Sequence, residues 1–381
     1  MAPEFQGGSV LLDAGAPAGD LPLTSDPAWN PERSKEAQFP SVSGYACRGR
    51  TEMPQDQPAW QVWHDESEAI RIGVSSCLLG RKVRYDGGHK RDRYLTDVIG
   101  EWTEWVSVCP EVEIGLGTPR PTIRLEGTVE DARLVEPKSG EDLTDRMREY
   151  SVQRIDELKS VDLDGYVLKR ASPSCGMERV RVWSEGGMPD KRGVGIFADA
   201  LLESWPNLPV EEEGRLNDPV LRENFVERIF CRHRWRSLLR LGLTRARLVA
   251  FHTAHKLLLR AHNEAGYRRL GVLVASFGQR PDAEIIADYE AEFFAVLKRR
   301  ATPKRHANVL QHAAGYLKKV VDPADRRELL GLVEDYRLGL VPLIVPVTML
   351  QHHVHRHHIG YLVGQIYLEP HPKELMLRNR V

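Results

Sequence analysis

Short apolar runs alternate with segments of helical spacing between residues 67 and 206 of this 381-residue chain. The apolar runs predict strands at 70–74, 105–108 and 165–169. Apolar residues three and four positions apart predict helices at 94–105, 142–158 and 197–205. Strands that alternate with helices form parallel sheets. We therefore expect a Rossmann-like α/β domain with a parallel sheet over residues 67–206.

The pattern changes after residues 207–220, a stretch with Pro and a Glu cluster that we interpret as a linker. Helical spacing predicts helices at 221–241, 244–265, 281–301, 304–320, 322–338 and 346–367, separated by Gly and Pro turn signals. No strand alternation is visible in this half. The expected fold class is thus α/β, with a mainly α-helical domain at 221–381 after the parallel-sheet domain.

The first 66 residues are rich in Pro, Gly, Ser, Asp and Glu and predict a disordered tail, in which Cys47 is incidental. No apolar run approaches the ~20 residues of a membrane helix, and no secretory signal is recognisable. Five widely spaced cysteines favour reduced thiols over a disulfide scaffold. We expect a cytoplasmic protein without membrane contact, either a monomer or a dimer.

The net charge of −1 conceals a strong asymmetry between the two halves. Residues 222–381 hold 27 Lys and Arg against 15 Asp and Glu, a balance of +12, while residues 1–221 hold 26 against 39, a balance of −13. Twelve of the 14 His also lie in the basic half. This pattern is typical of a nucleic-acid-binding module joined to another domain, although a solvated helical surface would also produce it.

Three cysteines, Cys77, Cys109 and Cys175, lie at or beside the ends of the predicted strands, next to Gly, Pro or Ser. Carboxyl ends of parallel strands meet at one sheet edge, where α/β proteins bind ligands, so these thiols are expected to converge. Soft thiolates select zinc, Cu(I) or iron–sulfur clusters. A single cysteine in such a place is usually a small buried hydrophobe. Three in matching contexts favour a metal site with one open position.

Polar residues near these cysteines are candidates for the rest of a site. Glu111 follows Cys109 by two positions and is a candidate general acid or base, and Ser174 precedes Cys175. Two polar loops at the same edge contribute Arg81, Lys82 and Arg120, which could hold a phosphate or a base. The alternatives are a first-turn carboxylate, a turn-stabilising hydroxyl and solubilising loops.

The helical half has candidate nucleic-acid contacts of its own. Its basic and imidazole side chains gather in three places and are candidates for phosphate and base contacts: His252, His255, Lys256, Lys304, Arg305, His306, Lys318 and Lys319. Five further His lie within residues 352–358. A second metal site there is less favoured than nucleic-acid contacts, because no carboxylate or Cys accompanies the cluster.

Motifs around these residues resemble two known families. Residues 70–199 are similar to the thiouracil desulfidase family (DUF523), on the segments 76–80 (SCLLG), 85–87 (YDG), 109–111 (CPE), 117–120 (GTPR) and 172–176 (SPSCG). The helical half is similar to a family often fused to it (DUF1722), on the segments 251–256 (FHTAHK), 306–312 (HANVLQH) and 361–368 (YLVGQIYL). The fused architecture resembles bacterial tRNA 4-thiouridine desulfidases.

The resemblance implies a cofactor, a reaction and a partner. The cofactor would be a [4Fe-4S] cluster held by Cys77, Cys109 and Cys175, with one iron that no protein group ligates. Glu111 and Ser174 would be catalytic, and the substrate would be tRNA carrying a thiolated uridine, hydrolysed to uridine and sulfide. Two alternatives stay open. One is a desulfidase of free thiolated bases, and the other is a non-catalytic, metal-containing nucleic-acid-binding protein.

Overall fold

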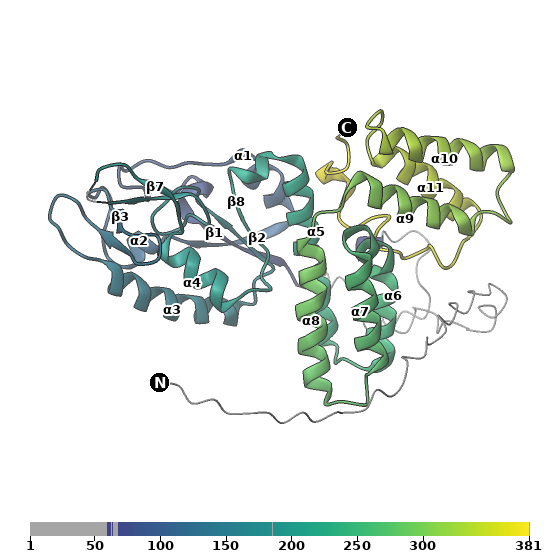
Figure 1. The fold of residues 1–381 in the computed structure, drawn as a ribbon, viewed down its shortest axis with the longest axis horizontal. Helices are drawn as coiled ribbons and strands as arrows, with labels where there is room; N and C mark the ends of the chain where they lie inside the picture. Colours follow the sequence, from purple (N-terminus) through teal and green to yellow (C-terminus); the bar gives the residue numbers. More distant parts are fainter. Residues whose placement is uncertain (1–58, 62, 64–67, 185, 381) are drawn as a thin grey trace, which may run out of the picture.

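A four-stranded parallel sheet organises the first half of the chain in the computed structural model, which describes residues 59–61, 63, 68–184 and 186–380 (Figure 1). Its strand order is β2 (Thr103–Val108), β1 (Ile70–Ser75), β5 (Gly165–Leu168) and β8 (Val210–Glu212). All three pairings are parallel, with Ile72 opposite both Trp105 and Gly165. The predicted α/β class with a parallel sheet is confirmed.

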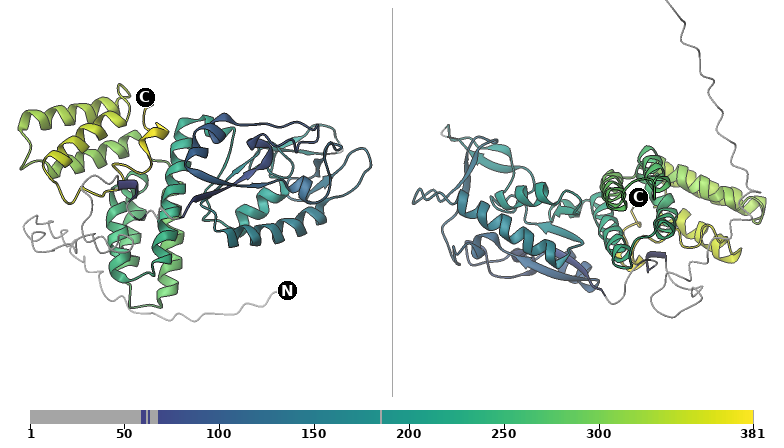
Figure 2. Two further views of the ribbon diagram at one scale, coloured as in Figure 1. Left: turned by 180° about the vertical axis from the view of Figure 1, so that it is seen from behind. Right: turned by 90° about the horizontal axis from the view of Figure 1, so that it is seen from below.

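Helices cover both faces of this sheet, as is usual for parallel sheets. One face packs against α3 (Thr144–Val161) and α4 (Ile196–Ser204) through residues such as Ile155 and Phe197. The other packs against α5 (Pro219–Arg240), whose Phe225 and Ile229 share a core with Ile72 of β1. The first helix of the helical half is therefore also a covering layer of the sheet, and it joins the two units (Figure 2).

A second sheet lies at the end of the α/β unit away from the helical half, and the sequence pattern did not predict it (Figure 1). Its strand order is β4 (Ala132–Val135), β3 (Arg124–Gly127), β6 (Val180–Trp183) and β7 (Asp190–Gly193). Each strand has only four residues. Runs this short carry too little periodicity to stand out from loops.

Two sequence predictions in the α/β unit are wrong. The helix expected at 94–105 is a short α1 (Arg93–Asp97) and a 3₁₀ turn η5 (Ile99–Glu101), because β2 pairs with β1 from Thr103 onward. The linker expected at 207–220 contains β8, which pairs with β5, and a 3₁₀ turn η6 (Arg215–Asn217). The remaining 3₁₀ turn here, η4 (Ser76–Leu79), and the short α2 (Pro110–Glu113) follow β1 and β2.

The second half is helical, as predicted. After α5 it contains α6 (Arg245–His262), α7 (Glu264–Ala275), α8 (Asp282–Lys298), α9 (Pro303–Tyr316), α10 (Pro323–Arg337), α11 (Ile344–Arg356) and η7 (Lys373–Leu375). Helix α7 was not predicted, because Gly266 reads as a turn signal. Gly266 instead lies inside α7, where a Cβ would come within 2.3 Å of Val296 Cγ2. The last predicted helix, 346–367, ends early at Arg356.

Aromatic side chains form the core of the helices, with Trp235 of α5 packed on Tyr289 and Phe251. The ring of Trp63 also packs on that of Phe251, with centroids 5.8 Å apart. Ala59 begins a short 3₁₀ turn, η3 (Ala59–Gln61), and its N–H donates to Glu369 Oε2 at 2.9 Å. The prediction of a disordered tail over 1–66 is wrong at these residues. The rest of that segment, including Cys47, lies outside the described residues.

A buried polar junction and the end of the chain tie the two units together. Asp164, immediately before β5, accepts hydrogen bonds from Arg236 Nη1 at 2.6 Å and from His233 Nδ1 at 3.2 Å, both on α5. Near the C-terminus, Arg378 pairs with Glu227 of α5 at 2.9 Å, and Leu375 packs into the core shared by β1 and α5. In the described chain no helix combines the length and apolarity that a membrane crossing demands.

Candidate active site

The three cysteines converge on one cavity, as the strand-end prediction required. Cys77 lies in the 3₁₀ turn after β1, Cys109 is the N-cap of α2 directly after β2, and Cys175 lies in the turn after β5. Because β2, β1 and β5 are neighbours in the sheet, their ends are adjacent. All three residues line a single cavity of about 260 Å³.

Close backbone packing fixes the turn that holds Cys175. Ser172 Oγ accepts hydrogen bonds from the backbone N–H groups of Ser174 at 3.2 Å and Cys175 at 3.1 Å. Gly195, the N-cap of α4, lies so close that a Cβ there would come within 2.6 Å of the Ser174 carbonyl. The carbonyl of Ser174 in turn accepts from the N–H groups of Phe197 and Ala198 in the first turn of α4. The Ser172 hydroxyl and the N-terminus of α4 thus hold the turn from its two sides.

The donor set of this cavity fits an iron–sulfur cluster. Burial raises the pKa of Cys77 to about 11 and raises that of Cys109 and, strongly, that of Cys175. The free thiols therefore hold their protons at neutral pH, and a metal must displace them on binding. Thiolates are the protein ligands that hold iron–sulfur clusters, and the three cysteines line this cavity together.

Glu111 lies beside the thiols with three side-chain donors on its carboxylate. It belongs to the first turn of α2, and its Oε1 accepts from Ser174 Oγ at 3.2 Å and from Ser172 Oγ at 3.3 Å. Arg120 Nη2 forms an ion pair with Oε2. The structure brings the two predicted catalytic residues together. Ser174 is fully buried behind the cavity, whereas Ser172, which was not singled out as a site residue, lines it.

Arg120 is placed to position Glu111. Its side chain is buried, and Nη1 donates to the carbonyls of Val83 at 2.9 Å and Gly117 at 2.8 Å, while Nη2 holds Glu111. Arg120 also lines the cavity, and its contact with a substrate oxygen or phosphate stays a prediction. Arg120 joins the 81–90 loop to the carboxylate.

In the loop of residues 81–90, the residues that line the cavity are not the two that were predicted. Arg81 and Lys82 are exposed and do not line the cavity, but Arg84 and Tyr85 of the same loop do. Lys169, at the end of β5, is a further lining residue, and it forms an ion pair with Glu213. Lys169 is the last residue of the strand predicted at 165–169, and a basic residue at such a strand end is the signal that could have identified it.

Three histidines proposed as nucleic-acid contacts are core residues. His252 stacks on Tyr267 with ring centroids 5.0 Å apart, His255 packs on Phe251, and His306 Nδ1 lies 3.0 Å from the Tyr367 hydroxyl. Burial lowers the pKa of His252 to about 4 and that of His306 to about 3, so both are neutral at pH 7. Neutral, buried imidazoles do not bind phosphates, and this part of the prediction is wrong.

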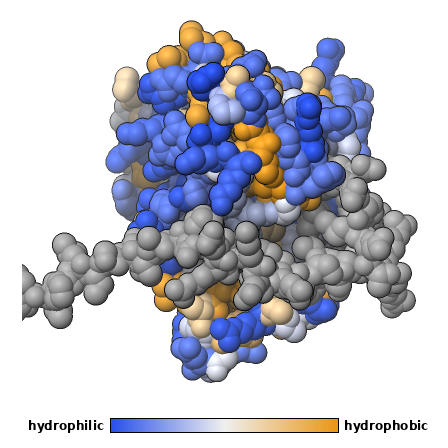
Figure 3. All heavy atoms as spheres, turned by 90° about the vertical axis from the view of Figure 1, so that its right-hand side faces the viewer, coloured by the Kyte–Doolittle hydropathy of each residue, from blue (hydrophilic) through white to orange (hydrophobic). Residues whose placement is uncertain are grey.

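The basic side chains of the helical half differ in their availability. Lys304, Lys318 and Lys319 are exposed at the two ends of α9, while Arg305 donates to the carbonyl of His262 at 2.8 Å. Lys256 lies 5.4 Å from the ring centroid of Tyr361. Seen from the end formed by α9–α11, the surface is mostly hydrophilic, with apolar patches between the polar side chains (Figure 3).

Comparisons with known proteins match the two units separately. Residues 72–213 match the family described as 2-thiouracil desulfurase, and residues 256–372 match a protein family of unknown function, DUF1722. The chain is 34% identical over 153 residues to the uncharacterized protein YbgA of Escherichia coli (strain K12), covering 40% of this chain and 90% of YbgA. It is 33% identical over 153 residues to the uncharacterized protein YbbK of Bacillus subtilis (strain 168), covering 39% of this chain and 98% of YbbK.

Among solved structures, the [4Fe-4S]-dependent thiouracil desulfidase TudS is 33% identical, with 39% of this chain and 93% of that chain covered and a TM-score of 0.32. The matches to YbgA and YbbK extend over nearly the whole length of those relatives. The chain therefore belongs to the 2-thiouracil desulfurase family through its α/β unit, and its helical half carries a domain of the DUF1722 family.

Proposed function

We propose that this protein is a [4Fe-4S]-dependent desulfidase that removes sulfur from 4-thiouridine in tRNA, giving uridine and sulfide. The observation that carries the proposal is the single cavity lined by Cys77, Cys109 and Cys175, with Glu111 on its wall. Family membership supports the reaction class, and the attached basic helical unit supports a polynucleotide substrate.

The chain supplies the cluster ligands and the proton chemistry. A cluster held by the three thiolates supplies, when bound, an iron without a protein ligand, which acts as a Lewis acid toward sulfur. Glu111 takes a proton from the water that attacks the thiolated carbon, and it returns that proton as sulfur leaves. Ser174, Ser172 and Arg120 hold the carboxylate in place for this transfer. One water replaces one sulfur, released as sulfide, so no reductant is consumed.

The helical unit is proposed to dock tRNA through its exposed lysines. Lys304, Lys318 and Lys319 are the available cations from the predicted set, and phosphate contacts position a nucleic acid without reading its sequence. A base inside a folded RNA is unstacked before it enters an enzyme pocket.

Nucleoside analysis of bacterial tRNA tests the proposal. Anaerobically reconstituted protein is incubated with bulk tRNA, which is then digested and analysed for 4-thiouridine and uridine. The proposal predicts that 4-thiouridine falls and uridine rises, and that omission of iron abolishes both changes. Turnover of free thiouracil with unchanged tRNA would contradict the proposed substrate and support the free-base alternative.

A further inference from the structure

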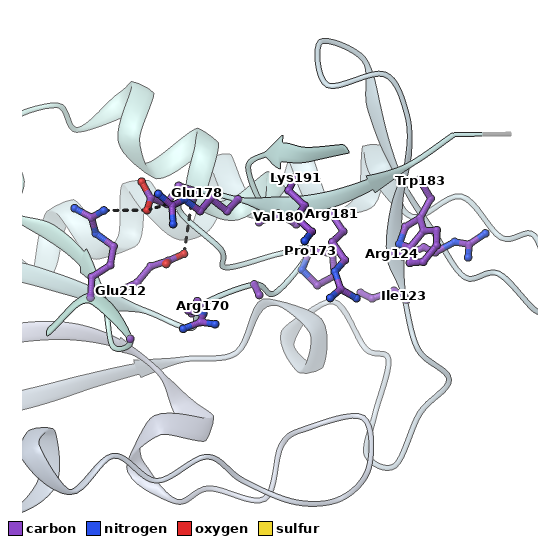
Figure 4. Close-up of a pocket in the computed structure, with 14 residues that line it drawn as sticks. Ile123, Arg124, Arg170, Pro173, Glu178, Val180, Arg181, Trp183, Lys191 and Glu212 are labelled. Atoms are coloured by element: carbon purple, nitrogen blue, oxygen red, sulfur yellow. Dashed lines mark hydrogen bonds and ion pairs between the residues drawn. The ribbon is translucent and has the colours of Figure 1, made fainter. Parts of the chain in front are cut away.

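A second and larger cavity opens beside the thiol cavity on the α/β unit. It has a volume of about 760 Å³ and is lined by β3, β6 and β7 of the second sheet and by residues after β5 and β8 (Figure 4). The two cavities share lining residues, namely Ile123, Arg170, Ala171 and Pro173. A chain-like ligand can therefore occupy both at once. We call the larger cavity the β6 groove.

Cations dominate the lining of the β6 groove. Six basic residues line it, against two carboxylates, Glu178 and Glu212: Arg124, Arg170, Arg179, Arg181, Lys191 and Arg215. Glu212 already accepts a hydrogen bond from the backbone of Met177 at 2.8 Å. Arg215 pairs with Glu211 at 2.5 Å and Arg124 with Glu126 at 2.7 Å. Within the described part of the chain, Arg170, Arg181 and Lys191 form no ion pair. Their positive charges are therefore available to an anionic ligand.

The second sheet presents these groups on its open face. Along β6, Val180 and Val182 are buried, whereas Arg181 is exposed and Trp183 is half-buried. Since successive side chains of a strand point to opposite faces, Arg181 and Trp183 share the open face. Arg124 of β3 lies over the Trp183 ring at 5.1 Å from its centroid (Figure 4). An open sheet face with cations and an aromatic ring is a surface suited to single-stranded nucleic acid.

We propose that the β6 groove binds the nucleotides that flank the thiolated base, with phosphates at Arg170, Arg181 and Lys191 and one neighbouring base near Trp183. This inference rests on the proposed function, because it takes the thiolated base to lie in the adjoining thiol cavity. Part of the RNA-binding surface of the protein would then lie on the α/β unit. A free base fills only the smaller cavity and gains nothing from the groove, so the groove favours polynucleotide substrates.

Binding of bulk bacterial tRNA to the full chain, measured across a range of salt concentrations, tests this inference without requiring turnover. The variant Arg181→Glu/Lys191→Glu removes two phosphate contacts and should make the slope of log affinity against log salt shallower by about 1.5. The control Lys138→Glu/Arg192→Glu changes the same charge at exposed positions outside the groove, and it should bind like the wild type. Trp183→Ala should also weaken binding, with recovery in Trp183→Phe.

Two outcomes overturn the inference: a wild-type chain that does not bind tRNA, and a groove variant with the affinity and salt slope of the control. Failure of the proposed function looks different. In that case the wild type binds RNA through the groove, the variant binds more weakly, and 4-thiouridine in the bound tRNA is not consumed.

Discussion

The carboxylate of Glu111 is the residue on which the proposed proton transfers depend. Serine hydroxyls hold one oxygen and Arg120 holds the other. Glu111→Gln keeps an oxygen that accepts from the serines but removes the base. We expect kcat to fall by about 10²–10⁴-fold, the range for loss of a positioned acid or base. The iron content should be unchanged.

A comparison with Glu101→Gln controls for the loss of one carboxylate, since Glu101 is exposed in the turn before β2. Initial rates of 4-thiouridine loss and iron per chain are measured for both variants. A Glu111→Gln protein with near-normal kcat would remove Glu111 from the proton transfer. Loss of iron in that variant would show that the residue supports the cofactor instead.

At the scale of elements, the contact between α4 and the Cys175 turn sets the geometry of the site. Gly195→Ala would place a Cβ within 2.6 Å of backbone atoms of Ser174, which cannot move aside as a flexible side chain can. We expect a loss in the free energy of unfolding of about 1–3 kcal/mol, as for other overpacked sites, and a lower iron content.

Gly331→Ala in α10 is the matched control, because a Cβ there meets nothing within 4 Å. Alanine is a better helix former than glycine, so this variant should be neutral or more stable by up to about 1 kcal/mol. Denaturant unfolding and iron analysis of both proteins check the pair. Equal stability and iron content of the two variants would show that the turn tolerates displacement.

The sequence predicted the elements that have long apolar patterns. Strands β1, β2 and β5 were found because each contains a short run of apolar residues in the sequence, although only β5 is buried along its whole length. This was enough to bring the three cysteines together. Strand β8 was missed because its Glu211 and Glu212 are polar, and their burial depends on partners far away in sequence, such as the Met177 N–H. Helical spacing correctly placed His252 and His255 in one helix, but only tertiary packing decides that these residues point into the core.

At the scale of the whole molecule, Asp164 holds the sheet to α5. Burial alone would raise the pKa of Asp164, but the hydrogen bond and charge of His233 and the charge of Arg236 hold it below its ordinary value. Asp164→Asn leaves His233 with a neutral partner in a buried site, and it leaves Arg236 with Asp162 as its charged partner. We expect a loss in the free energy of unfolding on the order of 3 kcal/mol at pH 7.

The pH dependence of that loss identifies its origin. A carboxyl whose folded pKa is depressed contributes stability above its unfolded pKa, about 3.9, and the contribution disappears as pH falls through the folded pKa. The difference in unfolding free energy between wild type and Asp164→Asn should therefore be constant from pH 7 to about pH 5 and shrink below pH 4. A difference that stays constant down to pH 2 would contradict the electrostatic account.

The exposed lysines at the ends of α9 also concern both units, because tRNA bound to them would have to place its thiolated base in the cavity of the α/β unit. Lys304→Glu/Lys319→Glu should weaken tRNA binding and make the salt slope shallower by about 1.5, while turnover of free thiouracil is unchanged. The charge-matched control is Lys138→Glu/Lys159→Glu on the α/β unit, where both lysines are exposed. Unchanged tRNA affinity in the α9 variant would place the RNA surface elsewhere.

In the proposed enzyme, three thiols from three strand ends act together as one iron site. Iron and acid-labile sulfide per chain are measured after anaerobic reconstitution of the wild type and of single Cys→Ser variants. We predict about four iron atoms in the wild type and in Cys231→Ser, which changes a buried thiol of α5, and far fewer in Cys77→Ser, Cys109→Ser and Cys175→Ser. Full iron content in any of these last three variants, or its loss in Cys231→Ser, would contradict the account.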